Sequence, residues 1–559
     1  MKKLIAILLA MCVVLGCTAC TPGGEVPDLT KTVVYVSHFN GGYGSEWIRE
    51  MEKDFEEKYD GYSFEEGKSG VDIYIKNHKT LGSKLDILAD DNYVYFLEDV
   101  DYKTKIDTGA ILDITDVVDG SFDINTAMND NTLPDVDESE KKIIDKFTDI
   151  QKDALNVGGS YYTIPHYEGY YGLTYDHDLF EKKSLYIDNR GNVGAKKSDG
   201  AEYLSKGPDG ISGTYDDGLP ATYEEFFELC EVLYTSNITP VIWSGEYQFY
   251  ITNTINALIT DYNGYENEKL FYNYEGTTDK YIVGWEADGT PKLGEKEIGL
   301  STGYEVFKQA GYYYGLSFLK TLVSSKNGGY MYKSNFTDGY THTMAQNQFL
   351  LNNKNGEQDI AMLADGIWWA NEARGMFDQM ELTYDKAGMY DRDLRFMPLP
   401  KATDDEVGKG LTLLESQKSF MMIRSDIPEK YVPICKLFLQ FCNTQENLEE
   451  WNVQSNTPKA LQYEISEANF KRLTPFAQSI LTMKNDENTK VIYQLSTQPL
   501  FADNMTLFKK HESLAYGAYE APSNALYGNK TLTAKDYYEG LAKSWAAKWE
   551  NSFGRYWKD

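Results

Sequence analysis

The segment 206–220, KGPDGISGTYDDGLP, gathers the side chains best suited to holding a metal ion. It contains Asp209, Thr214, Asp216 and Asp217 together with four glycines. Hard cations such as Ca²⁺ bind about six to eight oxygens, which carboxylates and the exposed carbonyls of a glycine-rich turn can supply. The spacing differs from that of an EF-hand, because the D-x-D-x-D-G series and the distal Glu are missing. Two interpretations stay open: a structural Ca²⁺ site that orders the loop, and an acidic turn without an ion.

Catalytic motifs are absent from the rest of the chain. The six histidines are dispersed, and neither H-E-x-x-H nor G-x-S-x-G occurs. His166 and His177 are expected to satisfy hydrogen bonds in loops. We therefore predict that the protein is not an enzyme and requires no cofactor.

A glycine-rich turn, HFNGGYG at 38–44, follows the β-branched segment 32–36. Its spacing matches neither G-x-G-x-x-G nor a Walker motif, so it is not a phosphate loop. A strand-to-helix turn lies at the carboxyl end of a strand, where open α/β sheets bind ligands. Asn40 and Tyr43 are therefore candidate ligand contacts, and the alternative is a plain turn whose glycines serve geometry alone.

The stretch 161–180, YYTIPHYEGYYGLTYDHDLF, contains two short strands separated by a small-residue crossing. Pro165 cannot continue a central ladder, and Gly169 and Gly172 permit backbone angles that other residues avoid. A strand that leaves one sheet and enters another suits a connector between two α/β lobes, which can absorb a hinge rotation. The alternative is an ordinary strand pair within one sheet.

Other segments show clear periodicity. Trp47, Met51, Phe55 and Tyr59 recur every four residues and predict a helix with one apolar face. A capping box at 222–225 begins another helix. The range 431–451 is predicted as one long amphipathic helix, and 538–549 carries an apolar stripe typical of a final helix.

Four stretches together resemble the family 1 extracellular solute-binding proteins, the maltose-binding-protein-like receptors of bacterial ABC sugar importers. They are 161–180, PATYEEFFELC (220–230), IAMLADGIWWANEA (360–373) and LRFMPLPKA (394–402). The resemblance implies a two-lobed α/β fold of the periplasmic-binding-protein type II class, with several hinge crossings. It places lobe 1 at 32–168 plus 399–453, and lobe 2 at 169–398 plus 454–559.

The same resemblance implies a sugar site. Asp365-Gly-Ile-Trp-Trp-Ala370 is similar to the family's loop in which an aromatic ring stacks on a sugar. A flat ring covers the apolar C–H face of a pyranose, while carboxylates and amides hold its hydroxyl rim. Trp368 is expected in the cleft and Trp369 in the core, with the reverse as the alternative. The remaining alternative is that both tryptophans are buried in the core of a helix packing and neither contacts a ligand.

Further ligand contacts are predicted at Tyr167, beside the crossing, and at Trp243 and Ser244. The last two end the strand that begins at 239, and the family places this strand end at the cleft.

The N-terminal segment 1–20 has the features of a lipoprotein signal peptide. Lys2 and Lys3 precede an apolar run too short to span a bilayer, and Val-Leu-Gly-Cys at 14–17 matches a lipobox. Cys17 is the predicted lipid-modified residue, with Cys20 as the alternative. The range 21–31 is predicted to be a flexible tether that holds the protein at the extracytoplasmic face of the cell membrane.

Composition narrows the function further. The 559 residues carry a formal charge of −32, which would repel phosphate backbones and makes nucleic-acid binding improbable. Outside the signal region only Cys230, Cys435 and Cys442 remain, and these are expected to be buried free thiols.

The sequence therefore predicts a monomeric, lipid-anchored receptor that binds a neutral carbohydrate, expected to be an oligosaccharide, and delivers it to an ABC permease. One alternative is a secreted glycoside hydrolase, because 86 Asp and Glu residues leave room for a pair of catalytic carboxylates. The other is an adhesive surface lipoprotein that binds a polysaccharide without lobe closure.

Overall fold

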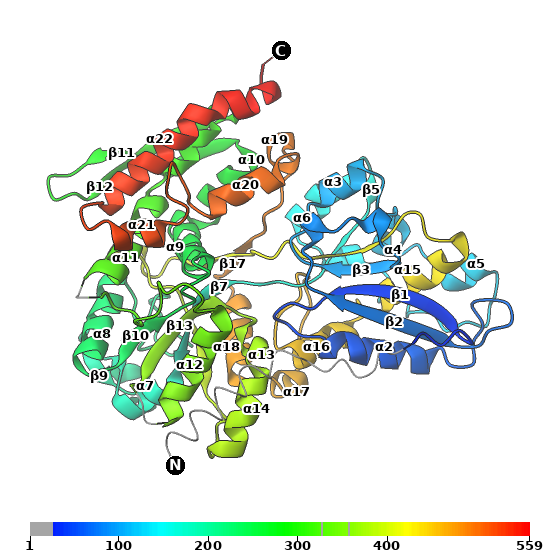
Figure 1. Ribbon diagram of the computed structural model, residues 1–559. Coiled ribbons are helices and arrows are strands. Elements are labelled where there is room, and N and C mark those ends of the chain that lie inside the picture. The colour runs from blue at the N-terminus through cyan, green and yellow to red at the C-terminus, as the bar shows by residue number, and fades with distance from the viewer. Residues whose placement is uncertain (1–25, 326–327, 356–357, 559) are drawn as a thin grey trace.

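The computed structural model describes residues 26–325, 328–355 and 358–558. They form two α/β lobes connected by several strands of backbone (Figure 1). The predicted signal peptide and both candidate lipid-modified cysteines lie outside the described residues. Among the helices that are described, none is long and apolar enough to cross a membrane.

Lobe 1 is built on a five-stranded sheet of order β2-β1-β3-β16-β6. The central strand β1 (Thr32–Phe39) is parallel to β2 (Val71–His78) and to β3 (Val94–Leu97), whereas β16 (Phe420–Ile423) and β6 (Ile164–Pro165) run antiparallel to their neighbours. The remaining elements of this lobe are α2 (Glu46–Lys58), α3 (Tyr102–Asp107), α4 (Thr115–Asp119), α5 (Ile124–Met128), α6 (Asp149–Ala154), β4 (Asn156–Val157), β5 (Ser160–Tyr161), α15 (Val432–Phe441), α16 (Gln445–Ser455) and the 3₁₀ helices η1 (Gly82–Lys84), η2 (Ile87–Ala89), η3 (Ile143–Lys146) and η8 (Glu429–Tyr431).

Lobe 2 contains a four-stranded sheet of order β10-β13-β7-β14. Its strands are β7 (Tyr171–Asp176), β10 (Thr239–Ile242), β13 (Ile360–Gly366) and β14 (Leu394–Met397). Around it lie α7 (His177–Lys183), β8 (Tyr186–Ile187), β9 (Val193–Ala195), α8 (Tyr223–Thr235), α9 (Phe249–Glu268), α10 (Leu270–Asn273), α11 (Ala310–Ser324), α12 (His342–Asn355), α13 (Trp369–Glu372), α14 (Arg374–Thr383) and the 3₁₀ helices η4 (Lys197–Asp199), η5 (Ala201–Tyr203), η6 (Leu300–Lys308) and η7 (Asp404–Glu406).

A helical layer from the C-terminal part of the chain completes lobe 2 (Figure 1). In it, the long helix α22 (Ala534–Phe553) packs on α11 and η6, and Trp545 and Trp549 are buried, as their spacing predicted. The elements not yet named are α17 (Glu467–Phe470), α18 (Pro475–Lys484), α19 (Pro499–Ala502), α20 (Met505–Glu512), α21 (Pro522–Gly528), η9 (Gly554–Tyr556), the hairpin β11 (Gly276–Trp285) with β12 (Pro291–Ile298), and the pair β15 (Thr412–Leu414) with β17 (Lys490–Ile492).

Three segments cross between the lobes: the link from β6 to β7, the link from β14 to β16, and the link from α16 to α18. They lie side by side, because Ser416 N donates to Gly169 O at 3.1 Å and Glu168 N donates to Pro458 O at 3.2 Å. The crossing predicted within 161–180 therefore connects two sheets, and the alternative of one strand pair in a single sheet is wrong. Adjacent crossings of this kind can bend together as a hinge.

One predicted helix is two helices in the structure. The range 431–451 divides into α15 and α16, because the chain leaves helical geometry at Thr444, whose extended backbone begins α16. The amide of Asn443 donates to Leu439 O and ends the preceding turn. The apolar residues of both helices face the same core, so their spacing did not reveal the break. The three predicted free thiols are confirmed as buried.

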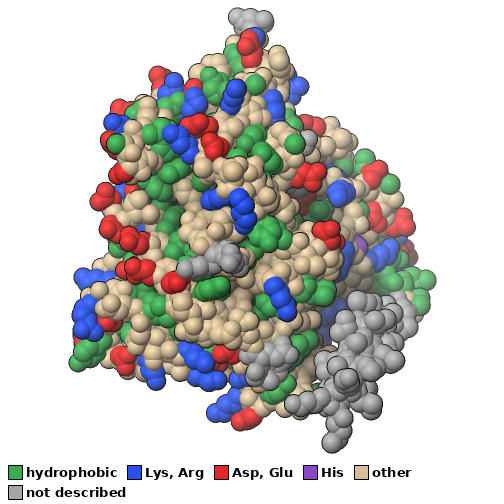
Figure 2. All heavy atoms as spheres, turned by 60° about the vertical axis from the view of Figure 1, so that its left-hand side comes forward, with side chains coloured by type: hydrophobic (Ala, Val, Ile, Leu, Met, Phe, Trp, Pro, Cys, Tyr) green, Lys and Arg blue, Asp and Glu red, His purple; other side chains and the backbone are tan. Residues whose placement is uncertain are grey.

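Acidic side chains do not gather in one patch on the face drawn in Figure 2, where Asp and Glu are scattered among Lys and Arg. The large negative charge of the chain is therefore spread over this face.

Candidate functional site

The carboxyl ends of three parallel strands of lobe 1 meet at the edge that faces lobe 2. β1 is followed by Asn40, Gly41 and Gly42, β2 by Lys79, and β3 by Glu98. Residues at this edge of an open sheet are the ones that bind ligands in α/β folds. The sheet thus brings three separate stretches of sequence to one wall.

The facing wall belongs to lobe 2. β13 ends at Gly366, and the turn after it carries Trp368 before the short helix that ends at Glu372. Tyr171, at the start of β7, and the first turns of α9 extend this wall outward.

A cavity of about 580 Å³ lies between the two walls and is lined by residues of both lobes. Residues of the crossing at 414–418 also line it. Its volume is within the range of pockets that enclose small organic ligands, roughly 300–1,000 Å³. The cavity is therefore the candidate binding site.

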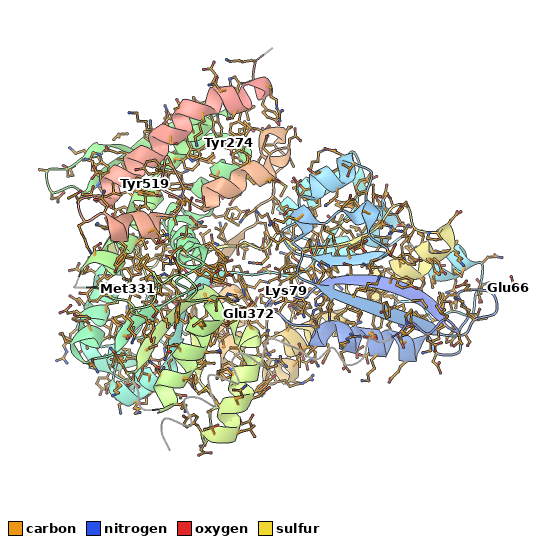
Figure 3. All side chains as sticks on the ribbon, in the orientation of Figure 1. Glu66, Lys79, Tyr274, Met331, Glu372 and Tyr519 are labelled. Atoms are coloured by element: carbon orange, nitrogen blue, oxygen red, sulfur yellow. The ribbon has the colours of Figure 1, made fainter. Side chains whose placement is uncertain are left out.

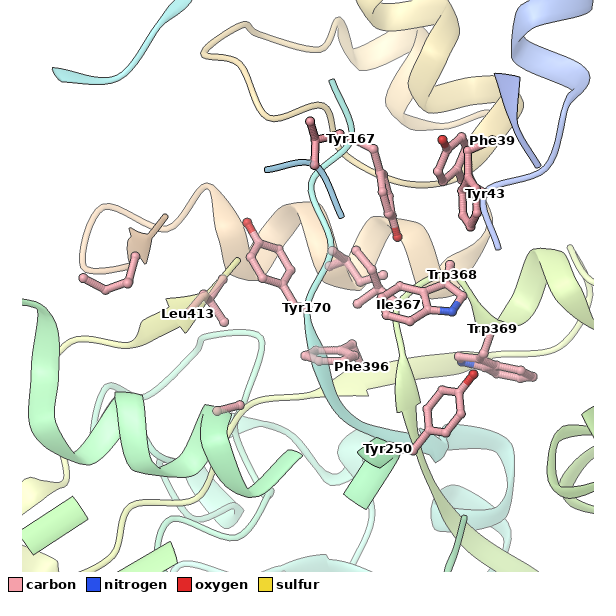
Figure 4. Packing of buried hydrophobic residues seen from close by; sticks show 14 of the residues in the cluster. Phe39, Tyr43, Tyr167, Tyr170, Tyr250, Ile367, Trp368, Trp369, Phe396 and Leu413 are labelled. Carbon is pink, nitrogen blue, oxygen red and sulfur yellow. The ribbon is translucent and has the colours of Figure 1, made fainter. Parts of the chain in front are cut away.

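Trp368 lies at the contact between the lobes (Figure 4). A Cβ atom on Gly42 of lobe 1 would sit 1.9 Å from Trp368 Cδ1, and one on Gly366 would sit 2.1 Å from Cη2. Both glycines are needed here because the indole packs directly on their backbones. Its ring centroid lies 4.9 Å from that of Tyr171 and 6.4 Å from that of Tyr167, in edge-on arrangements.

Carboxyl groups from both lobes line the cavity. Burial raises the pKa of Glu98 well above its usual value, and the neighbouring Glu372 and Glu415 raise it further. Burial also raises the pKa of Glu372, to about 7. The amide of Gln346 donates to Glu372 Oε2 at 2.8 Å and to Asp365 Oδ2 at 3.1 Å. The cavity therefore holds carboxyl groups that gain stability as neutral acids.

Lys79 also lines the cavity, and its positive charge lowers the pKa of Glu372. Figure 3 shows the two side chains at the junction of the lobes. The cavity is also lined by the amides of Asn40, Asn253 and Asn256. Side-chain amides both donate and accept hydrogen bonds, so these walls can donate to a ligand hydroxyl group or accept a hydrogen bond from it.

The structure brings some of the predicted contacts to the cavity. Asn40 and Trp368 line it directly. Tyr43 and Tyr167 lie just behind, 1% exposed each, with their ring centroids 4.5 Å apart. Among the described residues neither hydroxyl has a hydrogen-bond partner. Asp365 is 3% exposed and acts through Gln346 on Glu372.

Other predicted contacts lie in the core, and the structure corrects these expectations. Trp243 is fully buried, because β10 is an edge strand covered by 331–340: Asn335 accepts from Trp243 N at 3.2 Å, and Phe336 packs on the indole. Ser244 Oγ donates to Tyr340 O at 3.1 Å and is buried.

The adjacent tryptophans point in different directions, as expected. Trp369 is fully buried and its indole N–H donates to Thr174 Oγ1 at 2.9 Å, so it does not contact the cavity. Trp368 is the one that lines the cleft.

Sequence reasoning missed Lys79, Glu98, Glu372 and the aromatic start of α9. Lys79 and Glu98 are single residues after strands and Glu372 is the last residue of the short helix α13, and no local pattern marks any of them. The run Tyr247-Gln-Phe-Tyr250 follows a strand end and was the one available signal, since aromatic residues there are placed at the cleft.

The acidic loop at 206–220 lies apart from the cavity. The ammonium group of a lysine from the preceding segment, Lys197, already lies against it. The Lys197 ammonium donates to the carbonyls of Thr214, Tyr215 and Asp217 at 3.4, 3.3 and 2.9 Å. Asp216 accepts from the Asp209 N–H and from the Thr214 hydroxyl. These contacts favour the interpretation of an acidic turn without an ion, while the Ca²⁺ site stays a prediction.

Chelation tests the two interpretations. We expect EDTA to leave the melting temperature unchanged, because Lys197 neutralises the loop. Lys197→Met should lower stability by about 1–3 kcal/mol, since it leaves three partly buried carbonyls without their donor. Lys196→Met, on the exposed neighbour, is the matched control. A melting temperature that falls with EDTA and recovers with Ca²⁺ contradicts this expectation, because a bound ion at 100 times its Kd adds about 2.7 kcal/mol.

A second acidic group, Asp123, Asp135 and Glu138, could hold a metal by geometry. The Lys141 ammonium lies 3.5, 2.7 and 2.6 Å from these carboxylates and pairs with all of them. It is a salt-bridge network.

Solved structures with the same architecture were found over most of the chain. A chitin oligosaccharide binding protein is 16% identical, with a TM-score of 0.53 over 92% of this chain and 98% of that one. The solute-binding protein RafE in complex with raffinose is 13% identical, with a TM-score of 0.51 over 92% of this chain and 100% of that one. The apo form of RafE from Streptococcus pneumoniae is 13% identical, with a TM-score of 0.50 over 93% of this chain and 99% of that one.

No protein-family model and no curated protein sequence matches the chain. At these identities the likeness establishes the fold. The two-lobed α/β fold predicted from the sequence is confirmed.

Proposed function

We propose that this chain, which has the fold of the two-lobed solute-binding proteins, captures a neutral oligosaccharide in its interlobe cavity and delivers it to an ABC permease. The observation that carries the proposal is the cavity itself. Trp368 lines it at the contact between the lobes, and amides and carboxyl groups with raised pKa values line both walls. An aromatic ring with donors and acceptors around it suits a pyranose, which has an apolar face and a hydroxyl rim.

Closure of the lobes would bury the sugar and present one shape to the permease. Lipid attachment at Cys17, with Cys20 as the alternative, would hold the receptor at the extracytoplasmic face of the membrane. We infer a monomer, since a single chain supplies both walls of the cavity.

Calorimetry tests the proposal. The chain without residues 1–20 is titrated with gluco-, xylo-, manno- and galacto-oligosaccharides, and we expect saturable heat with one series. Absence of binding to every series would reject a carbohydrate ligand. Small-angle scattering with the sugar that binds tests closure, because an adhesive protein would bind without becoming more compact.

A glycoside hydrolase remains the second candidate, because Glu98 and Glu372 line opposite walls of one cavity. Hydrolysis uses two carboxyl groups across the scissile bond. Release of reducing sugar from the same oligosaccharides would support the hydrolase, and intact sugars after prolonged incubation would support the receptor.

The raised pKa of Glu372 predicts the pH dependence of binding. In the closed form its pKa is about 7, against an ordinary 4.5 where solvent reaches it, so closure takes up protons between these values. Affinity should fall as pH rises, by about fourfold between pH 6.5 and 8.5 from Glu372 alone. His342, whose pKa is lowered by burial, opposes this only below its ordinary value of 6.5.

Calorimetry at several pH values measures the effect. Glu372→Gln should remove the part of the slope that Glu372 contributes, while the part contributed by Glu98, whose pKa burial also raises, should remain. Glu381→Gln, on α14 outside the cavity, should retain the whole slope. Affinity that is constant or rises over this pH range in the unaltered protein would contradict the assignment.

A further inference from the structure

The last two carbonyl groups of α16, a helix of lobe 1, accept hydrogen bonds from lobe 2. The amide of Asn371 donates to Ser455 O, and Arg374 Nη2 donates to Gln454 O at 3.5 Å. The two donors are themselves joined, because Arg374 Nη2 also donates to Asn371 Oδ1 at 3.2 Å. Figure 1 shows α13 and α16 next to each other at the junction of the lobes. These four residues form the interlobe cap of α16.

The chain that follows α16 does not supply these donors. A helix leaves its last four carbonyls without partners in its own ladder. Asn456 adopts a left-handed backbone with a φ of 52° and ends the helix, and its N–H donates to Asn452 O at 2.8 Å. Gln454 O and Ser455 O lie beyond that contact, and their donors come from the other lobe. The end of α16 is therefore completed where the two lobes meet.

Arg374 also matches the electrostatics of a helix end. The C-terminus of a helix carries a partial negative charge of about −0.5, and a cation beside the last turn is stabilising. The last turn of α16 has no basic residue of its own. The guanidinium from lobe 2 therefore supplies the positive charge that this helix end lacks.

The interlobe cap belongs to the same stretch of lobe 2 as the cavity wall. Trp368 precedes α13 and Glu372 ends it, and both line the cavity. Asn371 and Arg374 do not line it. Asn371 N donates to Trp368 O at 3.1 Å, so the cap lies one turn from the residue that contacts Gly42 of lobe 1. The turn that lines the cavity and the donors that reach α16 are expected to move together.

We propose that Asn371 and Arg374 form a latch that holds the lobes closed by capping the C-terminus of α16. This inference rests on the proposed function and adds a conformational control to the same cavity. Opening the lobes would separate these donors from Gln454 O and Ser455 O and return all of these groups to water. Because the latch does not touch the ligand, it sets how long the lobes stay closed and not which sugar is bound.

Stopped-flow tryptophan fluorescence and calorimetry with each sugar that binds test the latch. Arg374→Met and Asn371→Ala should each weaken affinity by about 2- to 5-fold, the effect of losing a favourable interaction at a helix end. The loss should appear as faster dissociation with an unchanged association rate, because the latch forms after the sugar has entered. The factor should be the same for every sugar, since neither side chain lines the cavity.

Arg190→Met is the matched control. Arg190 is an arginine of lobe 2 whose side chain is 79% exposed and pairs with Asp188, two residues away. This variant should keep the dissociation rate of the unaltered protein, and thermal unfolding checks that all variants fold. Dissociation rates that are unchanged in both latch variants, or a loss that differs between sugars, would reject the latch and leave the proposed function in place.

Small-angle scattering without sugar gives a second measurement that does not depend on sugar binding. It compares the double variant Asn371→Ala/Arg374→Met with the unaltered protein and with Arg190→Met. If no sugar binds the unaltered protein, the proposed function fails and scattering alone decides the latch. A larger radius of gyration in the double variant would then support the latch, and an equal radius would reject it.

Discussion

Trp368→Ala is expected to weaken sugar binding by about 30- to 1,000-fold, the effect of removing a central aromatic anchor worth about 2–4 kcal/mol. Trp368 is 7% exposed and contacts lobe 1 through Gly42, so its removal takes away a wall of the cavity together with a contact that holds the lobes closed. Calorimetry with the tightest-binding sugar of the panel measures the change.

The adjacent residue provides the comparison. Trp369→Ala should lower stability by about 3–5 kcal/mol, because this indole is fully buried against Phe377 and Phe476. The fraction of this variant that stays folded should keep its affinity. The Trp368 variant should instead lose affinity even in the fraction that stays folded, although its indole is also buried in the core and its removal lowers stability as well. Equal affinity in the Trp368 variant and the unaltered protein would refute the role of this residue.

Gly42→Ala should prevent the lobes from closing. The added Cβ would lie 1.9 Å from Trp368 Cδ1, and the three nearest atoms it would meet all belong to the Trp368 side chain. The backbone of Gly42 lies outside the positive-φ region, so lobe 1 alone accepts alanine without strain. Affinity should fall by about tenfold or more, because apparent affinity scales with the fraction of protein able to close. Small-angle scattering should show that the variant does not become more compact with sugar.

The double variant Gly42→Ala/Trp368→Ala separates closure from other effects. Without the indole the two closest contacts are gone and only the Cβ of residue 368, at 2.6 Å, remains, so Gly42→Ala should cost less in that background than in the unaltered protein. Gly375→Ala, where a Cβ would have no neighbour within 4 Å, is the control. A Gly42→Ala protein that compacts normally and binds with full affinity would show that the lobes close in another way.

Local sequence determined the elements that surround the site. The proline and glycines of 161–180 predicted a link between two sheets, and the structure has β6 in one sheet and β7 in the other. The four-residue spacing of Trp47, Met51 and Phe55 predicted a buried helix face, and all three are buried in α2. Such patterns are readable because burial on one face of a helix or strand imposes a short repeat on the chain.

The tertiary structure alone decided which residues from distant parts of the sequence lie next to each other in the cavity. Trp243 and Trp368 both follow strand ends, yet only Trp368 reaches the cavity: β13 lies inside the sheet facing lobe 1, whereas β10 is at its edge under 331–340. Glu98 and Glu372 are 274 residues apart in sequence (372 − 98) and carry no repeat that links them. They lie in one cavity because the order of the strands and the way the two lobes face each other bring two distant turns together. The periodicity of a single segment predicts neither the strand order nor the arrangement of the lobes.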